Sequence, residues 1–245
     1  MLALGVGTAT AERSQHGTVI VTLDGGISPK KLPRHRPAPV SVYLAGGVKT
    51  VDHSPLPRVN SIKLEIAWRG ELETKGLPVC PRERLDSTDS RQALRLCGDA
   101  LVGHGGLFAH IFVPNQRPFG IHADLLAFNG KDESGRPAVW VQGYSTDPPV
   151  SIILPFSVHR QKGNFKTVLV SIIRRAVGPW PRVANFDIEV SREFTYEGER
   201  RSYLNASCPV PKGFTAGFLS LARATYNFAG GDQQTTESVR SCRAR

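Results

Sequence analysis

The sequence predicts an all-β protein, and three observations favour that fold class. Apolar and charged residues alternate in many short segments. Gly and Pro are abundant, with 24 and 18 residues in a chain of 245. Turn residues such as Asp24-Gly25-Gly26 separate the alternating segments. Pro lacks the N–H that regular ladders need and Gly favours turns, so we expect short strands in an antiparallel, sandwich-like fold.

The alternation is clearest at residues 62–68, where Ile62, Leu64 and Ile66 are apolar and Lys63 and Glu65 are charged. A period of two is typical of a half-buried strand with one wet face. The same reasoning predicts strands at residues 19–23, 40–44, 107–113, 121–128, 138–144, 150–158, 167–173, 186–190, 218–228 and 235–242.

We expect one or two short helices, and one of them has a clear signal in the sequence. Ser87 or Thr88 is a suitable N-cap, Leu94 and Leu96 follow, and Gly98 marks the end.

An internal repeat predicts two related modules. Residues 55–59 (PLPRV) precede IKLEI at 62–66, and residues 179–183 (PWPRV) precede FDIEV at 186–190, an offset of 181 − 57 = 124. Each copy leads to a Cys-Pro pair. An offset near half the chain length indicates a duplication. We therefore expect sandwich-like modules at residues 12–128 and 138–245, joined by a polar linker at residues 129–137.

The four cysteines indicate two disulfides. Cys80, Cys97, Cys208 and Cys242 are even in number, and the chain contains no C-x-x-C motif of the zinc or redox type. We favour Cys80–Cys97 and Cys208–Cys242 among the three pairings, because each bond then stays within one half of the chain. In the chain-entropy model such bonds stabilise the fold by roughly 3 to 4 kcal/mol each.

The N-terminal segment indicates export. Ala9-Thr10-Ala11 matches the small-x-small pattern before a signal-peptidase site, so residues 1–11 are interpreted as the remnant of a signal peptide. The basic region that normally begins a signal peptide is absent, which leaves an ordinary apolar segment as the alternative. The cysteines favour the secreted or extracytoplasmic location. No apolar stretch approaches the length of a membrane span.

Several segments together resemble a group of uncharacterised exported bacterial proteins. They are GLPVC at 76–80 followed by Cys97, ALVGHG at 100–105, LAFNG at 126–130, ILPF at 153–156 and ASCP at 206–209. The resemblance covers most of the chain after residue 17. It implies export, disulfides and a β-rich fold, and it carries over no activity.

Two groups of residues are candidate binding sites. If a hairpin at residues 107–127 centres on Arg117, His110 lies opposite Asp124 with His122 diagonal to both, which is a possible metal or proton-transfer site. The competing interpretations are residues on the wet face of the hairpin, or partly buried and hydrogen-bonded histidines that share a face with Phe108. Trp180 lies between two prolines, so we expect it to be exposed, whereas burial is expected for Trp68 and Trp140.

The leading functional hypothesis is a secreted or envelope-associated structural or binding protein without enzymatic activity or cofactor. Nucleophile and phosphate-binding motifs are absent. The formal net charge of +10 favours acidic envelope polymers or polysaccharide as partners, although the basic residues are dispersed along the sequence. The alternatives are a carbohydrate-binding module and a metal-dependent hydrolase using His110, His122 and Asp124. Nucleic-acid binding ranks last because export opposes it.

The compartment hypothesis makes a first prediction. We expect the natively exported protein to begin at Glu12 or nearby and to show no alkylatable thiol before reduction. Intact mass after thiol alkylation, with and without reductant, measures both quantities. Four free thiols on a chain with an intact N-terminus would contradict export.

Overall fold

A computed structural model describes residues 12–67 and 70–245 of the chain. The expected signal peptide and Trp68 lie outside these residues. The elements are β1 (Glu12–His16), β2 (Val19–Ser28), β3 (Lys31–Leu32), β4 (Ala38–Pro39), β5 (Ser41–Thr50), β6 (Val59–Ala67), β7 (Gly70–Leu72), η1 (Arg82–Arg84), α1 (Ser90–Cys97), η2 (Gly98–Ala100), β8 (Leu101–Ile111), β9 (Phe119–Lys131), β10 (Pro137–Thr146), β11 (Pro149–Arg160), β12 (Phe165–Ser171), α2 (Ile173–Val177), β13 (Pro181–Val190), β14 (Glu193–Tyr196), β15 (Glu199–Ser202), β16 (Leu204–Ala206), β17 (Ala216–Phe228) and β18 (Gln233–Ala244).

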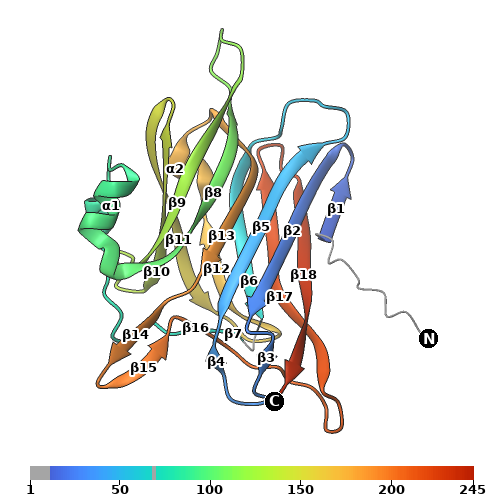
Figure 1. The fold of residues 1–245 in the computed structure, drawn as a ribbon. Helices are drawn as coiled ribbons and strands as arrows, with labels where there is room; N and C mark the ends of the chain where they lie inside the picture. The colour runs from blue at the N-terminus through green and yellow to red at the C-terminus, as the bar shows by residue number, and fades with distance from the viewer. Residues whose placement is uncertain (1–11, 68–69) are drawn as a thin grey trace, which may run out of the picture.

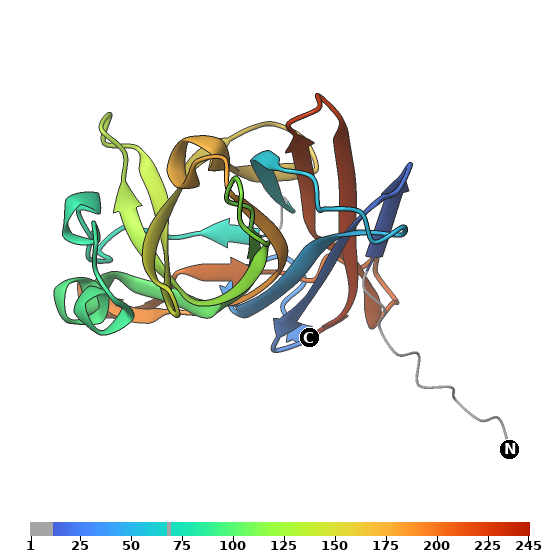
Figure 2. The ribbon, with the colours of Figure 1, turned by 90° about the horizontal axis from the view of Figure 1, so that it is seen from above.

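The predicted all-β class is confirmed. One large sheet has 13 strands in the order β1-β2-β5-β13-β8-β9-β10-β11-β12-β6-β17-β18-β3, and its only parallel pairing is between β18 and β3 within the described chain. The sheet curls on itself, so that its inner face surrounds one core (Figures 1 and 2). A sheet of three short strands, β4-β16-β7, lies at the lower end in Figure 1.

Polar side chains join the two ends of the curled sheet. Thr236 on β18 donates to the Glu12 carbonyl at 3.2 Å, and the Gln234 amide reaches the Val19 carbonyl at 3.4 Å. Arg240 donates to the Glu12 carboxylate at 2.7 Å and also pairs with Asp24. These bonds hold β18 against β1 and β2 where no strand ladder connects them. We call this row of side chains the seam.

The large sheet contains two runs of five strands with the same topology. The first is β2-β5-β13-β8-β9, and the second is β11-β12-β6-β17-β18. Each run takes four strands from one half of the chain and its middle strand from the other half. The exchanged strands are β6 and β13, the two strands of the sequence repeat. In place of an open linker, residues 129–137 belong to the hairpin of β9 and β10, in which Lys131 pairs with Pro137.

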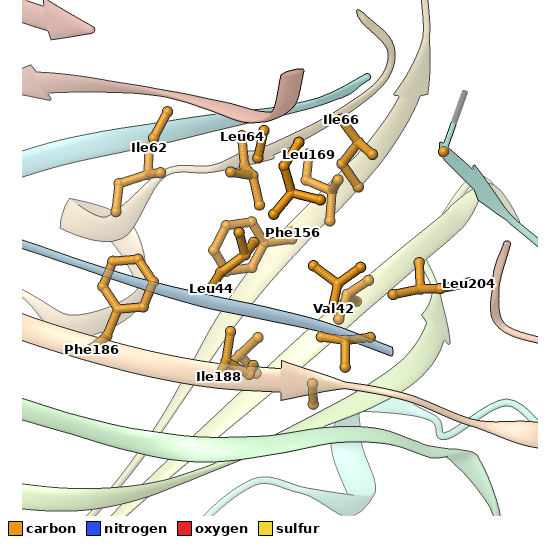
Figure 3. A pocket seen from close by; sticks show the side chains of 18 of the residues that line it. Val42, Leu44, Ile62, Leu64, Ile66, Phe156, Leu169, Phe186, Ile188 and Leu204 are labelled. Carbon is orange, nitrogen blue, oxygen red and sulfur yellow. The ribbon is translucent and has the colours of Figure 1, made fainter. Parts of the chain in front are cut away.

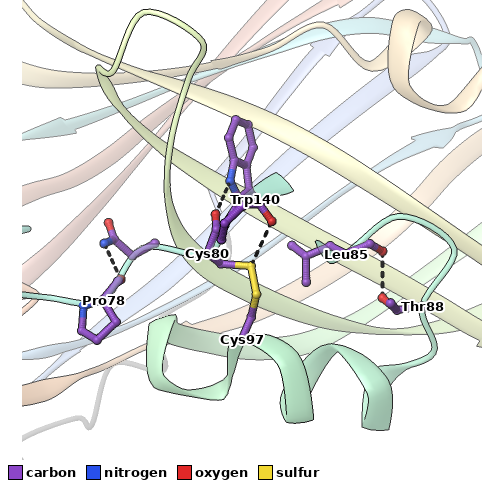
Figure 4. The surroundings of a disulfide bond; sticks show 8 residues. Pro78, Cys80, Leu85, Thr88, Cys97 and Trp140 are labelled. Atoms are coloured by element: carbon purple, nitrogen blue, oxygen red, sulfur yellow. Dashed lines mark hydrogen bonds between the residues drawn. A yellow bond between two sulfur atoms is a disulfide. The ribbon is translucent and has the colours of Figure 1, made fainter. Parts of the chain in front are cut away.

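The predicted helix is confirmed as α1 and lies on the outer face of β9 and β10. Asp89, rather than Ser87 or Thr88, caps it through a capping box with Gln92. The helix buries Ala93 and Cys97 and exposes Leu94 and Leu96. The Cys80–Cys97 disulfide holds the segment, and the Trp140 indole N–H donates to the Cys80 carbonyl at 3.1 Å (Figure 4). Buried side chains of this segment, including Leu85 and Ala93, pack with Trp140 and Phe128 in a second, smaller core outside the sheet.

The second favoured disulfide, Cys208–Cys242, is also present and ties the segment after β16 to β18. Beside it, the Cys208 N–H donates to the Pro33 carbonyl at 2.9 Å. Both predicted pairings are therefore confirmed. Disulfides of this kind are typical of oxidising, extracytoplasmic compartments.

The exchanged strand β6 carries a buried carboxylate on its outer face, and neighbouring side chains bind it. The Glu65 side chain is 2% exposed and accepts two bonds from the Arg223 guanidinium at 2.8 and 2.9 Å. Gln161 and Lys63 contact it at 3.1 and 3.3 Å. These donors outweigh desolvation and lower the pKa of Glu65 from 4.5 to about 2. The charge thereby links β6 to β17 and to the end of β11.

The ion pair predicts an acid-sensitive fold. Because the folded-state pKa of Glu65 is depressed, its stabilisation is present above pH 4.5 and is lost as the pH falls toward 2. At 1.36 kcal/mol per unit this is at most about 3 kcal/mol. Glu65→Gln should lower the free energy of unfolding at pH 7 and reduce its loss in acid. Denaturant unfolding at pH 7 and in acid measures both changes, with the exposed Glu199→Gln as control. Equal acid sensitivity in the parent and in Glu65→Gln would contradict the prediction.

Candidate functional site

The inner face of the curled sheet surrounds an apolar cavity of about 200 Å³. Ten neighbouring strands of the large sheet, from β2 to β17, and the short strands β7 and β16 contribute lining residues, most of which are aliphatic. Figure 3 shows Ile62, Leu64 and Ile66 of β6 facing Val42 and Leu44 of β5 across the space, with side chains such as Phe156 and Phe186 completing its wall. The exchanged strands therefore both line the cavity.

The cavity exists because the sheet encloses more space than its side chains fill. The width of a closed sheet grows with its number of strands, and side chains fill the interior only at about eight. Inward residues such as Leu64, Phe156 and Ile188 accordingly remain only half-buried, whereas core side chains are usually packed without voids. The volume exceeds the ~150 Å³ of an engineered cavity that binds benzene and lies below the ~300 Å³ at which drug-sized pockets begin.

Two tyrosines supply the polar groups of this wall. Tyr203 and Tyr226 line the cavity and are 2% and 1% exposed, and neither hydroxyl has a hydrogen-bond partner among the described residues. Burial raises the pKa of both phenols above its ordinary value, so each keeps its proton. Neither hydroxyl oxygen is exposed to the cavity, so a bound molecule would meet an almost wholly apolar surface.

The tyrosines lie toward different ends of the cavity. Tyr226 pairs with Ile62 on β6, which in turn pairs with Ser171 on β12, whose buried hydroxyl also lacks a partner within the described chain. Tyr203 directly precedes Leu204, at the opposite end of the view in Figure 3 from Ile62. The space between these two ends is lined almost entirely by apolar side chains, which suits an apolar molecule.

The expected His110–Asp124 pairing is wrong. The hairpin centres on Asn115, whose φ of 61° suits a turn, so His110 pairs with Gly120 and Asp124 with Gly106. Asp124 instead accepts from Ser90 at 3.4 Å on the outer face. Over the described residues, no three His, Cys, Asp or Glu side chains are placed to hold a metal ion.

The histidines instead flank an aromatic ring. Phe108 lies 5.0 Å from the ring of His110 and 4.7 Å from that of His122, centroid to centroid. Phe108 and His122 are directly paired on neighbouring strands. His122 is exposed, as the wet-face interpretation expects, whereas His110 is half-buried beside Phe108.

The structure describes two of the three tryptophans, and the exposure of each agrees with the prediction. Trp180 is exposed in the connection between α2 and β13, and Trp140 is buried under α1. Neither side chain lines the cavity. The cavity and its two tyrosines are not predicted by any motif in the sequence. The available signal was the number of alternating segments, because a closed sheet of ten or more strands is too wide to be filled.

No protein-family model, curated protein or solved structure matches the chain. The resemblance to exported bacterial proteins therefore stays a prediction. Within the described residues, no helix has the length and apolar character needed to cross a membrane.

Because the Tyr203 and Tyr226 hydroxyls have no partner among the described residues, removing either of them is expected to stabilise the fold. Tyr203→Phe and Tyr226→Phe should each raise the free energy of unfolding of the ligand-free protein by about 1 kcal/mol, because a buried group without a partner loses its hydration. Denaturant unfolding measures the change, with Tyr43→Phe on the exposed outer face as the control. A loss of stability in both cavity variants would show that the hydroxyls already have partners.

Proposed function

We propose that the protein is a secreted or envelope-associated binding protein, without enzymatic activity, that holds a small apolar molecule inside its curled sheet. The cavity is the observation that carries this proposal. Its wall comes from both halves of the chain and from all ten neighbouring strands between β2 and β17. A ligand held there would contact most of the sheet.

The energetic cost of the cavity supports a ligand. In core mutants, stability falls by about 24 cal/mol for each Å³ of unfilled volume. For 200 Å³ this amounts to roughly 5 kcal/mol, which is comparable to the whole net stability of many domains. A molecule that fills the space would recover much of this loss.

Cavity size and chemistry restrict the ligand. A single aromatic ring or a short hydrocarbon chain matches the volume, and the wall offers it an almost wholly apolar surface. A sugar needs many hydrogen bonds, which this aliphatic wall does not provide. The cavity therefore favours an apolar ligand over the carbohydrate alternative.

The extracytoplasmic location is part of the same proposal. It is supported by the two disulfides, by the small-x-small pattern before Glu12 and by the resemblance to exported proteins. Free cysteines, which a reducing compartment would maintain, do not occur in the described chain.

Thermal unfolding with small probes tests the proposal. We expect benzene or toluene to raise the midpoint by several degrees at saturation, because a ligand bound only by the folded state stabilises it by mass action. Leu64→Trp places a larger ring in the cavity from a half-buried inward position and should remove the shift. Leu94→Trp makes the same change on the exposed face of α1 and should leave the shift intact.

Ile188→Phe places a smaller ring in the cavity and is a second filling variant in case the Leu64→Trp protein does not fold. A result against the proposal would be a filling variant that raises the midpoint while no probe affects the parent protein. The cavity would then be a packing defect that small molecules do not enter.

A further inference from the structure

Three segments that are far apart in the sequence meet at one end of the molecule. β3 pairs in parallel with the end of β18, where Arg243 lies opposite Lys31. The Ala244 N–H donates to the Thr215 carbonyl at 2.9 Å, which adds the loop before β17. Figure 1 shows β3 and the C-terminus together at the lower end. The assembly of these three segments is called the basic end.

Positive charge is concentrated there. The exposed side chains are Lys30, Lys31, Arg36, Lys212, Arg243 and Arg245, and none of them forms a salt bridge within the described part of the chain. Residues 28–40, 203–222 and 241–245 contain no Asp or Glu. These six charges compare with a formal net charge of +10 for the whole chain. The basic residues that are dispersed along the sequence are therefore gathered by the fold.

Two exposed phenylalanines accompany the charge. Phe218 is 82% exposed and Phe214 is 62% exposed, the highest values among the large apolar side chains that the structure describes. Phe218 pairs with Ser241, and Ala216 pairs with Arg243, so Phe218 and Arg243 lie on the same outer face. Large apolar side chains exposed on a monomer usually mark an interaction surface.

The fold holds the loop that carries Phe214 in place. The Arg34 guanidinium donates to the carbonyls of Val210 and Pro211 at 3.0 Å each and to that of Phe214 at 2.7 Å. The Cys208–Cys242 disulfide lies immediately behind this loop. Phe214 and the neighbouring cations are thus presented on a fixed support.

We propose that the basic end docks the protein on the surface of an anionic lipid bilayer. Lysine and arginine near such a surface are attracted to its headgroups, and aromatic side chains enter the boundary between headgroups and acyl chains. A soluble polyanion would satisfy the cations and leave Phe214 and Phe218 in water. The phenylalanines therefore favour a lipid surface, and this surface is separate from the cavity and does not depend on a cavity ligand.

Vesicle co-sedimentation tests the proposal with the whole protein. We expect binding to phosphatidylcholine vesicles that contain phosphatidylglycerol, and weak binding to phosphatidylcholine alone. The triple variant Lys30→Gln, Lys31→Gln, Arg243→Gln should lower the partition coefficient about a hundredfold, because each cation contributes about fivefold. The pair Phe214→Ser, Phe218→Ser should lower it at least about tenfold, since two apolar side chains no longer enter the interface.

A matched control variant lies near α2, away from the basic end in Figure 1: Arg174→Gln, Arg175→Gln and Trp180→Ser remove two cations and an exposed aromatic. This control should bind as the parent does, and unchanged unfolding midpoints confirm that all variants fold. Two outcomes overturn the proposal. One is equal binding to neutral and anionic vesicles. The other is undiminished vesicle binding by the phenylalanine pair together with parent-like binding to heparin, which would assign the basic end to soluble polyanions.

Discussion

Closure of the large sheet is the constraint on which the rest of the structure depends. A curled sheet must either pair its first and last strands or protect them, because an open edge invites pairing with other chains. Here the seam performs this role through side chains: Gln234, Thr236 and Arg240 of β18 bond to the backbone and carboxylates of β1 and β2. The seam thereby holds the two ends of the sheet together around the apolar cavity.

The cavity and the basic end have different chemistry and are separate regions of the molecule. The cavity is aliphatic with two phenols, whereas the basic end combines unpaired cations with Phe214 and Phe218 on the outside. Tyr203 and Leu204 lead into the small sheet at the lower end of Figure 1, near the basic end. One end of the cavity wall thus lies on the side of the molecule that would face a bilayer.

Local patterns in the sequence predicted much of the fold but little of the site. Alternation located most of the long strands, the helix signal located α1 although Asp89 rather than Ser87 or Thr88 is its cap, and half-chain spacing selected both disulfides. The His110–Asp124 register failed because it depends on the turn centre, and Asn115 rather than Arg117 occupies that position. The cavity depends on the total width of the sheet, and the basic end depends on a pairing between residues about 200 positions apart. Neither property can be read from a short window of sequence.

The exchange of β6 and β13 has a consequence for how the chain is made. The duplication behind it remains a prediction, but the order of strands is definite: β13 lies between β5 and β8, and β6 lies between β12 and β17. The first run therefore lacks its middle strand until residue 190 has emerged from the ribosome, and the second run waits for β18. Neither run can be completed from one half of the chain alone, so no complete five-strand run is available until β13 has been made, about three quarters of the way along the chain.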